Sequence, residues 1–159
     1  MKELTALQAA LRAEHAAVYG YGVVGGRIDE ERKSEVRECY EAHRARRDAL
    51  RRTVRSLGGV PEPAAAAYAL PFAVPDSAAA VRLAAQLEDR VAGVYADLVR
   101  ASEGARRRTA ADALREAAVR SVRWKGSSVA FPGLTELGAG DSPAAPSGSP
   151  NGSDAPGKL

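Results

Sequence analysis

The chain has few of the features that stabilise or anchor a protein by means other than a packed core. It contains a single cysteine, Cys39, so no disulfide can form within it, which is typical of proteins in a reducing compartment. It has no run of about 18 apolar residues, the length that a membrane-spanning helix needs. Its first residues, MKELTALQAALRAEH, have no long uncharged apolar block and no cleavage-site pattern, so we expect no signal peptide. The sequence therefore predicts a cytoplasmic protein without a membrane segment.

Histidine and aromatic residues are also scarce, which limits the chemistry that the chain can perform. Aromatic residues make up 5% of the sequence, and the only histidines are His15 and His43. Both lie inside predicted helices, and neither a Ser/His/Asp nor a Cys/His catalytic arrangement can be assembled around them. The net charge of +3 is mild, and the arginine-rich stretch 44–55 has no aromatic residue among its charges. We therefore expect no nucleic-acid partner.

What the sequence does have is helical periodicity. Apolar residues recur every three or four positions in four segments, at about 4–26, 34–57, 77–102 and 107–125. Asp76 or Ser77 is a suitable cap for the third segment, and glycines at 58, 59 and 126 are suitable ends for the second and fourth. Alanine is abundant in all four, and it both favours helices and lets them pack closely. These patterns predict an all-α protein.

The connections between the predicted helices are unequal. Short turns join the first helix to the second and the third to the fourth, and short turns make antiparallel neighbours. The second and third helices are joined by about twenty residues, GGVPEPAAAAYALPFAVPDS, which include four prolines. A connection of that length can cross the whole bundle, as in ferritin-like folds. We expect a ferritin-like antiparallel four-helix bundle over residues 1–134, and a disordered Gly/Ser/Pro-rich tail over 135–159.

Ionisable residues interrupt three of the apolar stripes near the middle of their helices. Glu14 lies on the first stripe and Glu88 on the third. His43 and Arg47 lie one turn apart on the second. An unpaired charge in the interior costs several kcal/mol, so these four residues are expected to meet one another. The spacing predicts a polar cluster inside the bundle, to which Tyr40 adds a hydroxyl group.

Two interpretations of this cluster remain open. In the first it is structural: the Arg47 guanidinium binds a carboxylate, and Tyr40 and His43 complete a hydrogen-bonded network without any ligand. In the second it holds a single divalent ion between Glu14, Glu88 and the His43 imidazole, which are suitable ligands for Fe, Mn or Zn. The cationic side chain of Arg47 opposes this second interpretation.

A di-iron centre is disfavoured by the spacing of the histidines. Such centres in helical bundles take a Glu-x-x-His motif from each of two helices. Here Tyr40 lies three residues before His43, and Arg12 lies three before His15, so the motif is absent. Charge also opposes two divalent ions, because the cluster has only two or three carboxylates and one of them faces an arginine.

Five stretches carry a resemblance to a known family: LRAEHAAVYGYGVVG, AHRARRDALR, AAAAYALP, REAAVRSVRWKG and AFPGL. In this order, over about residues 3–134, they resemble the actinobacterial ferritin-like domain family of unknown function. The resemblance implies a ferritin-like bundle in a homo-oligomer, and it implies no particular activity. By comparison with ferritins it matches Glu14, His43 and Glu88 to ligand positions on the first three helices, and Glu116 to one on the fourth. Tyr40 replaces the bridging glutamate, which argues against ferroxidase chemistry.

Two classes of function follow. The protein is expected to be a non-catalytic bundle that acts through its surface, without a cofactor, and forms a homodimer through the glycine-rich part of its first helix. The alternative is an oxidoreductase that binds a divalent metal, Fe or Mn, through Glu14, His43, Glu88 and Glu116. The sequence identifies no catalytic residue and no protein partner beyond a second copy of the chain.

Overall fold

The structure, a computed structural model, describes residues 2–126 and consists of four long helices over that range. They are α1 (Glu3–Gly25), α2 (Lys33–Ser56), α3 (Ser77–Ala101) and α4 (Gly104–Lys125), with a 3-10 turn, η1 (Glu30–Arg32), before α2 and no strand in the described part. The prediction of an all-α chain with four helices is confirmed. The predicted domain boundary at 134 and the predicted disorder of 135–159 lie outside the described residues.

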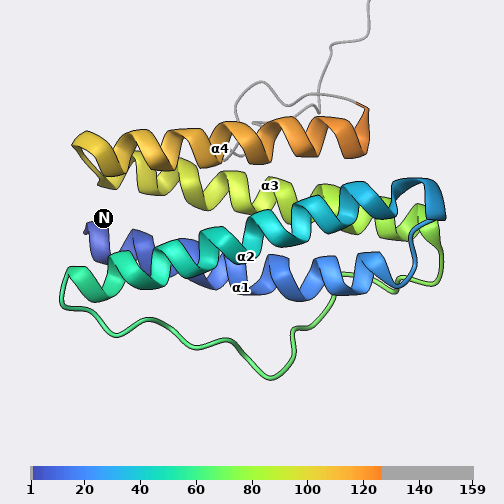
Figure 1. The fold of residues 1–159 in the computed structure, drawn as a ribbon, viewed down its shortest axis with the longest axis horizontal. Helices are drawn as coiled ribbons and strands as arrows, with labels where there is room; N and C mark the ends of the chain where they lie inside the picture. The colour runs from blue at the N-terminus through green and yellow to red at the C-terminus, as the bar shows by residue number, and fades with distance from the viewer. Residues whose placement is uncertain (1, 127–159) are drawn as a thin grey trace, which may run out of the picture.

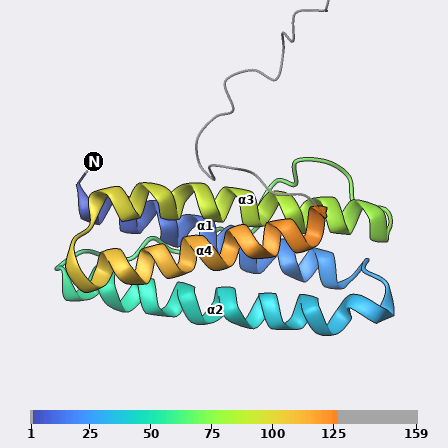
Figure 2. The ribbon, with the colours of Figure 1, turned by 90° about the horizontal axis from the view of Figure 1, so that it is seen from above.

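The helices lie side by side along one direction (Figures 1 and 2). In Figure 1 the chain runs from left to right along α1, returns along α2, runs in the same direction as α2 along α3, and returns along α4. The backbone of α1 packs against those of α2 and α3, and α3 packs against α4. No Cα atom of α2 comes within 8 Å of one in α4, so long side chains fill the space between these two helices.

The connections differ in length as the sequence predicts. A short segment that includes η1 joins α1 to α2, and Ser102 and Glu103 join α3 to α4. Residues 57–76, the crossover, have no helix or strand and run along the outside of the molecule from the end of α2 to the start of α3 (Figure 1). The Asp76 side chain caps α3 by accepting a hydrogen bond of 2.8 Å from the amide of Ala79, as predicted.

Hydrogen bonds attach the crossover to α1. The Gln8 side chain donates to the carbonyl of Val60 at 2.7 Å and accepts from the amide of Glu62 at 3.0 Å. His15 Nε2 donates to the carbonyl of Glu62 at 3.1 Å, and Arg12 pairs with the Glu62 carboxylate at 3.0 Å. These contacts fix the first part of the crossover on the outer surface of α1.

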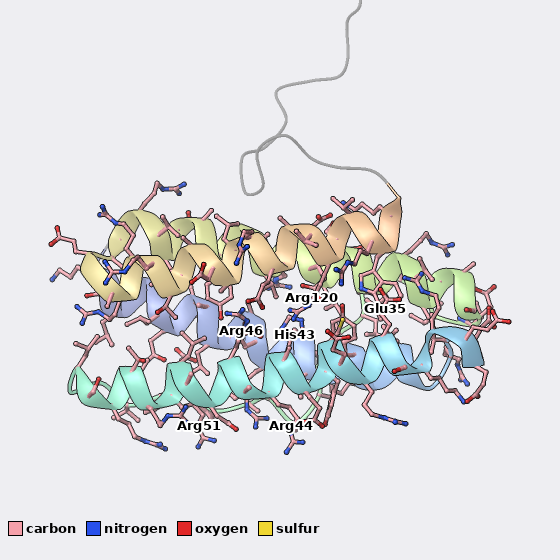
Figure 3. The ribbon with its side chains drawn as sticks, turned by 45° about the horizontal axis from the view of Figure 1, so that its top comes forward. Glu35, His43, Arg44, Arg46, Arg51 and Arg120 are labelled. Carbon is pink, nitrogen blue, oxygen red and sulfur yellow. The ribbon has the colours of Figure 1, made fainter. Side chains whose placement is uncertain are left out.

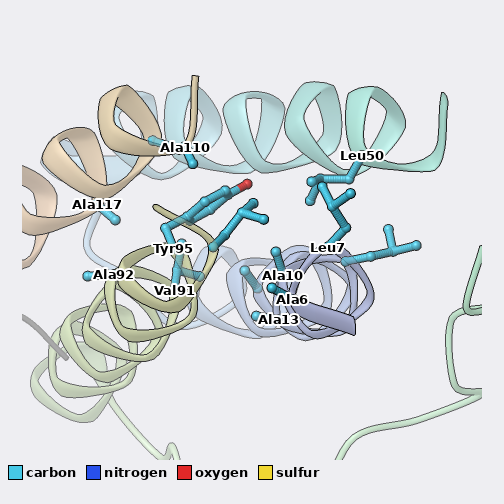
Figure 4. Packing of buried hydrophobic residues seen from close by; sticks show 14 of the residues in the cluster. Ala6, Leu7, Ala10, Ala13, Leu50, Val91, Ala92, Tyr95, Ala110 and Ala117 are labelled. Atoms are coloured by element: carbon cyan, nitrogen blue, oxygen red, sulfur yellow. The ribbon is translucent and has the colours of Figure 1, made fainter. Parts of the chain in front are cut away.

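The core consists mainly of small residues. Two clusters of buried apolar side chains fill the two halves of the interior, and alanines make up much of the first (Figure 4). Because an alanine projects little beyond the backbone, helices that meet through alanines approach closely, and the few large side chains fill the remaining space. The larger apolar side chains of the first cluster are Leu7, Leu11, Leu50, Val54, Val91, Tyr95 and Leu98.

The glycines of α1 are used mainly within the chain. A Cβ atom at Gly20 would lie 2.5 Å from Cδ1 of Leu87 on α3, which is too close for any residue other than glycine unless Leu87 moves. At Gly25 a Cβ atom would lie 3.5 Å from Val36 on α2. Gly22 faces open space. Of these three glycines, the one with a tight contact is Gly20, and that contact is with α3 of the same chain and not with a second copy.

Candidate functional site

Three of the predicted cluster residues meet in the centre of the molecule. Glu14 comes from α1, His43 from α2 and Glu88 from α3, and each has an exposed fraction of 0%. The apolar stripes of these helices face one another in the interior, so an ionisable residue that lies on such a stripe is buried as well. We call these three residues the Glu–His–Glu cluster.

His43 lies between the two carboxylates and bonds to both. Its Nδ1 atom is 2.6 Å from Oε2 of Glu14, and its Nε2 atom is 3.1 Å from Oε1 of Glu88. Carboxylate oxygens accept hydrogen bonds, so both ring nitrogens donate. A histidine that donates from both nitrogens is an imidazolium cation. The cluster therefore contains one positive charge between two negative ones.

Aromatic side chains donate further hydrogen bonds to the carboxylates. The hydroxyl of Tyr95 donates to Oε1 of Glu14 at 2.6 Å, and the hydroxyl of Tyr21 donates to Oε1 of Glu88 at 2.6 Å. The indole N–H of Trp124 donates to the Tyr21 hydroxyl at 3.0 Å, which links α4 to the network. The Tyr21 ring also stacks on the His43 ring, with centroids 5.2 Å apart. All four helices thus contribute to one buried network.

The electrostatics of the network follow from burial and from these bonds. Burial lowers the pKa of His43, but the hydrogen bonds and charges of Glu14 and Glu88 outweigh it and raise the pKa to about 9. Burial and the Glu88 carboxylate raise the pKa of Tyr21 far above its usual value. Burial and the Glu14 carboxylate do the same to the pKa of Tyr95. Both tyrosines therefore stay protonated and donate their hydrogen bonds, while His43 stays charged at neutral pH.

One atom of the network lacks a partner. Oε2 of Glu88 is buried and is the single buried side-chain nitrogen or oxygen atom without a hydrogen bond among the described residues. An unpaired buried carboxylate oxygen carries a desolvation cost of about 1–3 kcal/mol. It is the one acceptor of the network that remains free to bind a proton, a water molecule or a cation.

The structure does not bring Arg47 into the cluster, and this corrects the sequence analysis. Its guanidinium pairs instead with the neighbouring Asp48 at 2.9 Å and is partly exposed. The buried face of α2 includes His43 and Leu50, and Arg46 and Arg47 lie on the two flanks of this face, about 100° apart around the helix. Arg46 is the inward-facing arginine: it pairs with Glu116 and lies 5.9 Å from the centre of the Tyr95 ring. Figure 3 shows Arg46 beside His43 between α2 and α4.

Tyr40 and Glu116, the other predicted site residues, also lie outside the cluster. Tyr40 is half-buried, its ring lies 5.7 Å from the Arg44 guanidinium, and no hydrogen bond joins it to the cluster within residues 2–126. Burial raises the pKa of Glu116, but the hydrogen bond and charge of Arg46, together with the charges of Arg120 and Arg115, outweigh it and lower the pKa. Arg46 therefore separates Glu116 from the two buried glutamates.

This arrangement of donors does not fit a two-metal centre. A histidine ligand must offer the lone pair of one ring nitrogen to the metal, and both nitrogens of His43 bond to carboxylates instead. Glu116 is held by Arg46. Among the residues that the structure describes, no three histidine, cysteine, aspartate or glutamate side chains are placed to hold one ion. The cation between the two carboxylates is the imidazolium of the chain itself.

Sequence reasoning missed the aromatic members of the network and the inward arginine. Tyr21, Tyr95 and Trp124 fit the apolar pattern of their helices, because a hydroxyl or an indole N–H group does not disturb a hydrophobic pattern. A signal was nevertheless present. Each buried carboxylate needs donors, and a tyrosine lies seven residues after each of the two glutamates, two helical turns away on the same face.

Comparison with known proteins relates the chain to proteins of undescribed function. Residues 6–136 match the family model described as Domain of unknown function (DUF4439). The crystal structure of a conserved hypothetical protein from Mycobacterium tuberculosis is 36% identical, and the match covers 77% of this chain and 93% of that one with a TM-score of 0.75. No curated protein matches the chain. Within residues 2–126 none of the helices is both long and apolar enough to cross a membrane.

Proposed function

The chain belongs to the family described as Domain of unknown function (DUF4439), and we propose that it is a ferritin-like binding protein without a metal centre. In this proposal the Glu–His–Glu cluster is structural and takes the place of a di-iron site. The protein acts through its surface and not by catalysis. The buried thiol of Cys39, as the only cysteine, supports a reducing compartment such as the cytoplasm.

The course of the chain supports the ferritin-like assignment. Two helical pairs with short connections are joined by one long crossover, and the second and third helices run in the same direction (Figure 1). This is the connectivity of single-crossover bundles such as ferritins. Glu14, His43 and Glu88 lie at mid-length on facing helices, where ferritin-like proteins carry their metal ligands.

The observation that carries the proposal is the double hydrogen bond of His43. A divalent ion bound by Glu14 and Glu88 would compete with the imidazolium for the same carboxylates, and His43 would have to lose a proton to become a ligand. Because the cluster raises the pKa of His43 to about 9, that proton is held tightly at neutral pH. The imidazolium balances the carboxylates without a metal.

We expect protein purified without chelators to contain far less than one equivalent of iron, manganese or zinc by mass spectrometry. We also expect Mn²⁺ at neutral pH to leave its melting temperature unchanged, because a ligand that does not bind the folded state cannot stabilise it. Glu41→Gln serves as a matched control, since it removes an exposed carboxylate that pairs with Arg44 outside the cluster. One equivalent of metal, retained in Glu41→Gln and lost in Glu14→Gln or Glu88→Gln, would overturn the proposal.

The alternative function, a divalent-metal-binding ferritin-like oxidoreductase that uses Fe or Mn, has one observation in its favour. Oε2 of Glu88 is buried without a partner, as a ligand atom would be in the absence of its ion. Glu14, Glu88 and a neutral His43 would then hold a single cation, and Glu116 would have to leave Arg46 to join them. The metal measurement above separates this function from the one we propose.

We further propose that the protein is a homodimer. Val119 and Val122 are large apolar residues on the outer surface of α4, with exposed fractions of 46% and 36%. They line a shallow groove with Ala92 and Ala118, which a second copy of this surface would cover. Multi-angle light scattering is expected to give twice the chain mass for wild type and the single chain mass for Val119→Glu/Val122→Glu. A wild-type monomer at high concentration would contradict the proposal.

A further inference from the structure

A second polar site lies on the surface beside α2, outside the Glu–His–Glu cluster. It is a groove of about 570 Å³ between α2 and the first part of the crossover. We call it the basic groove. Its lining residues are His15, Arg47, Arg51, Arg55, Gly59, Val60, Pro61, Glu62, Pro63 and Ala64. A volume of this size is typical of sites for small organic ligands.

The groove exists because the crossover is attached to α1 and not to α2. After α2 ends, the chain turns at Gly58, whose φ of 77° lies in the left-handed region that glycine adopts readily. Gly59 then passes so close to Val54 that a Cβ atom would lie 3.0 Å from Val54 Cγ1. From Val60 onward the hydrogen bonds to Gln8, Arg12 and His15 hold the crossover on α1. The adjacent side of α2 is left uncovered.

Three arginines form the α2 wall of the groove. Arg47, Arg51 and Arg55 recur every fourth residue, so they lie on one face and follow one another by about 6 Å along the helix. In Figure 3, Arg51 points away from the interior, on the opposite side of α2 from His43 and Arg46. The result is a row of guanidinium groups about 12 Å long.

The positive charge of this row is only partly balanced. Arg47 pairs with Asp48, and the single carboxylate that lines the groove, that of Glu62, pairs with Arg12. Within residues 2–126 neither Arg51 nor Arg55 has a carboxylate oxygen within 4 Å. Two guanidinium groups with five N–H donors each therefore face the groove without an anion. Guanidinium groups bind phosphate oxygens in a two-pronged geometry, which a row of them repeats.

Apart from Glu62, the opposite wall is apolar. Its apolar residues are Val60, Pro61, Pro63 and Ala64, and Val60 has an exposed fraction of 85%. One wall of the groove is therefore cationic, and the other consists mainly of proline rings and methyl groups. A purely inorganic anion would use only the first side, whereas an organic phosphate would use both.

We propose that the basic groove binds a free organic polyphosphate of the size of a nucleoside triphosphate. Its phosphates would lie along Arg47, Arg51 and Arg55, and its ring would pack on Pro61 and Pro63. The crossover closes one side of the groove, and the lining contains no Phe, Tyr or Trp on which successive bases of a nucleic acid would stack, so the geometry favours one nucleotide over a strand. This inference rests on the proposed binding function and names its ligand class.

The test is titration of the full chain with ATP and with inorganic tripolyphosphate, followed by calorimetry and by amide NMR shifts. We expect ATP to bind more tightly than tripolyphosphate, and the largest shifts at Val60, Glu62 and Ala64. Arg51→Gln/Arg55→Gln is expected to weaken ATP binding by tenfold or more. The control Arg52→Gln/Arg108→Gln removes two exposed arginines outside the groove and is expected to bind like wild type.

Other results would overturn the inference. Equal loss of affinity in the two double variants would mean that only net charge attracts the ligand. Tighter binding of a single-stranded oligonucleotide than of ATP would indicate a nucleic-acid surface instead. If wild type does not bind ATP, the proposal that the basic groove binds an organic polyphosphate is wrong. This result would not affect the metal measurement on the Glu–His–Glu cluster. The ATP titration therefore tests the ligand of the basic groove, and the metal measurement separately tests the proposal that the protein has no metal centre.

Discussion

Replacing His43 with leucine is expected to lower the free energy of unfolding by roughly 3–5 kcal/mol. The substitution keeps much of the volume but removes the imidazolium that separates Glu14 from Glu88. Two carboxylates then remain in a space with 0% exposure and no positive charge between them. One of them must take up a proton or admit water, and either change costs free energy. Urea unfolding at neutral pH, followed by circular dichroism, measures the loss.

A triple variant separates the charge effect from the packing effect. In Glu14→Gln/His43→Leu/Glu88→Gln both carboxylates are neutral amides that still accept hydrogen bonds from Tyr95 and Tyr21. We expect it to recover most of the stability that His43→Leu loses, because no unpaired charge remains. If His43→Leu unfolds at the wild-type urea concentration, or if the triple variant is less stable than the single one, the ion pairs do not hold this network together.

Raising the pH above neutrality is expected to destabilise the protein through the same residue. The pKa of His43 is about 9 in the folded chain against 6.5 as its ordinary value. A pKa that is raised on folding contributes stability that is fully present below about pH 6.5 and is lost as the pH rises through about 9. Each pKa unit corresponds to 1.36 kcal/mol, so the loss is about 3 kcal/mol between these two pH values.

Urea unfolding of wild type at pH 6.5, 8 and 9.5 measures how the free energy of unfolding depends on pH. The same measurement on a variant shows which residues cause that dependence. The triple variant Glu14→Gln/His43→Leu/Glu88→Gln has no titrating group left in the cluster, so its stability is expected to change little over this range. A wild-type curve that is flat between pH 6.5 and 9.5 would show that His43 is not a cation in the folded protein. A slope of equal size in wild type and in the triple variant would assign the effect to other groups.

The sequence is sufficient to predict the helices and the Glu–His–Glu cluster, but not the aromatic residues that complete the buried network. Particular residues show the physical reasons. Helix periodicity is a local property, and each helix begins and ends within three residues of its predicted position. Glu14, His43 and Glu88 could be assigned to the interior because each interrupts an apolar stripe. Arg46 and Arg47 could not be distinguished this way, because both lie about one turn from His43 and are chemically identical. The position of the α2 axis relative to α4 decides between them, and that position depends on packing across the whole bundle.

The basic groove illustrates what lies beyond such reasoning. The sequence shows that the arginines of α2 form a charged face. A charged face becomes a binding groove only when another segment of the chain forms a second wall facing it. The opposing wall comes from the crossover, whose path is decided by contacts between residues about fifty positions apart, such as Gln8 with Val60. No local pattern in the proline-rich segment indicates which helix it follows.

The way in which the crossover is fastened has a consequence for how the protein can diversify. Gln8 binds the carbonyl of Val60 and the amide of Glu62, and His15 binds the carbonyl of Glu62, so three of these four contacts are made to the main chain. Only the contact between Arg12 and the Glu62 carboxylate depends on which amino acid the crossover carries. Every residue except proline offers the same amide, and every residue the same carbonyl. The side chains of the crossover can therefore change in evolution while its backbone keeps the same path. The ligand preference of the groove can change in this way without a change in the fold.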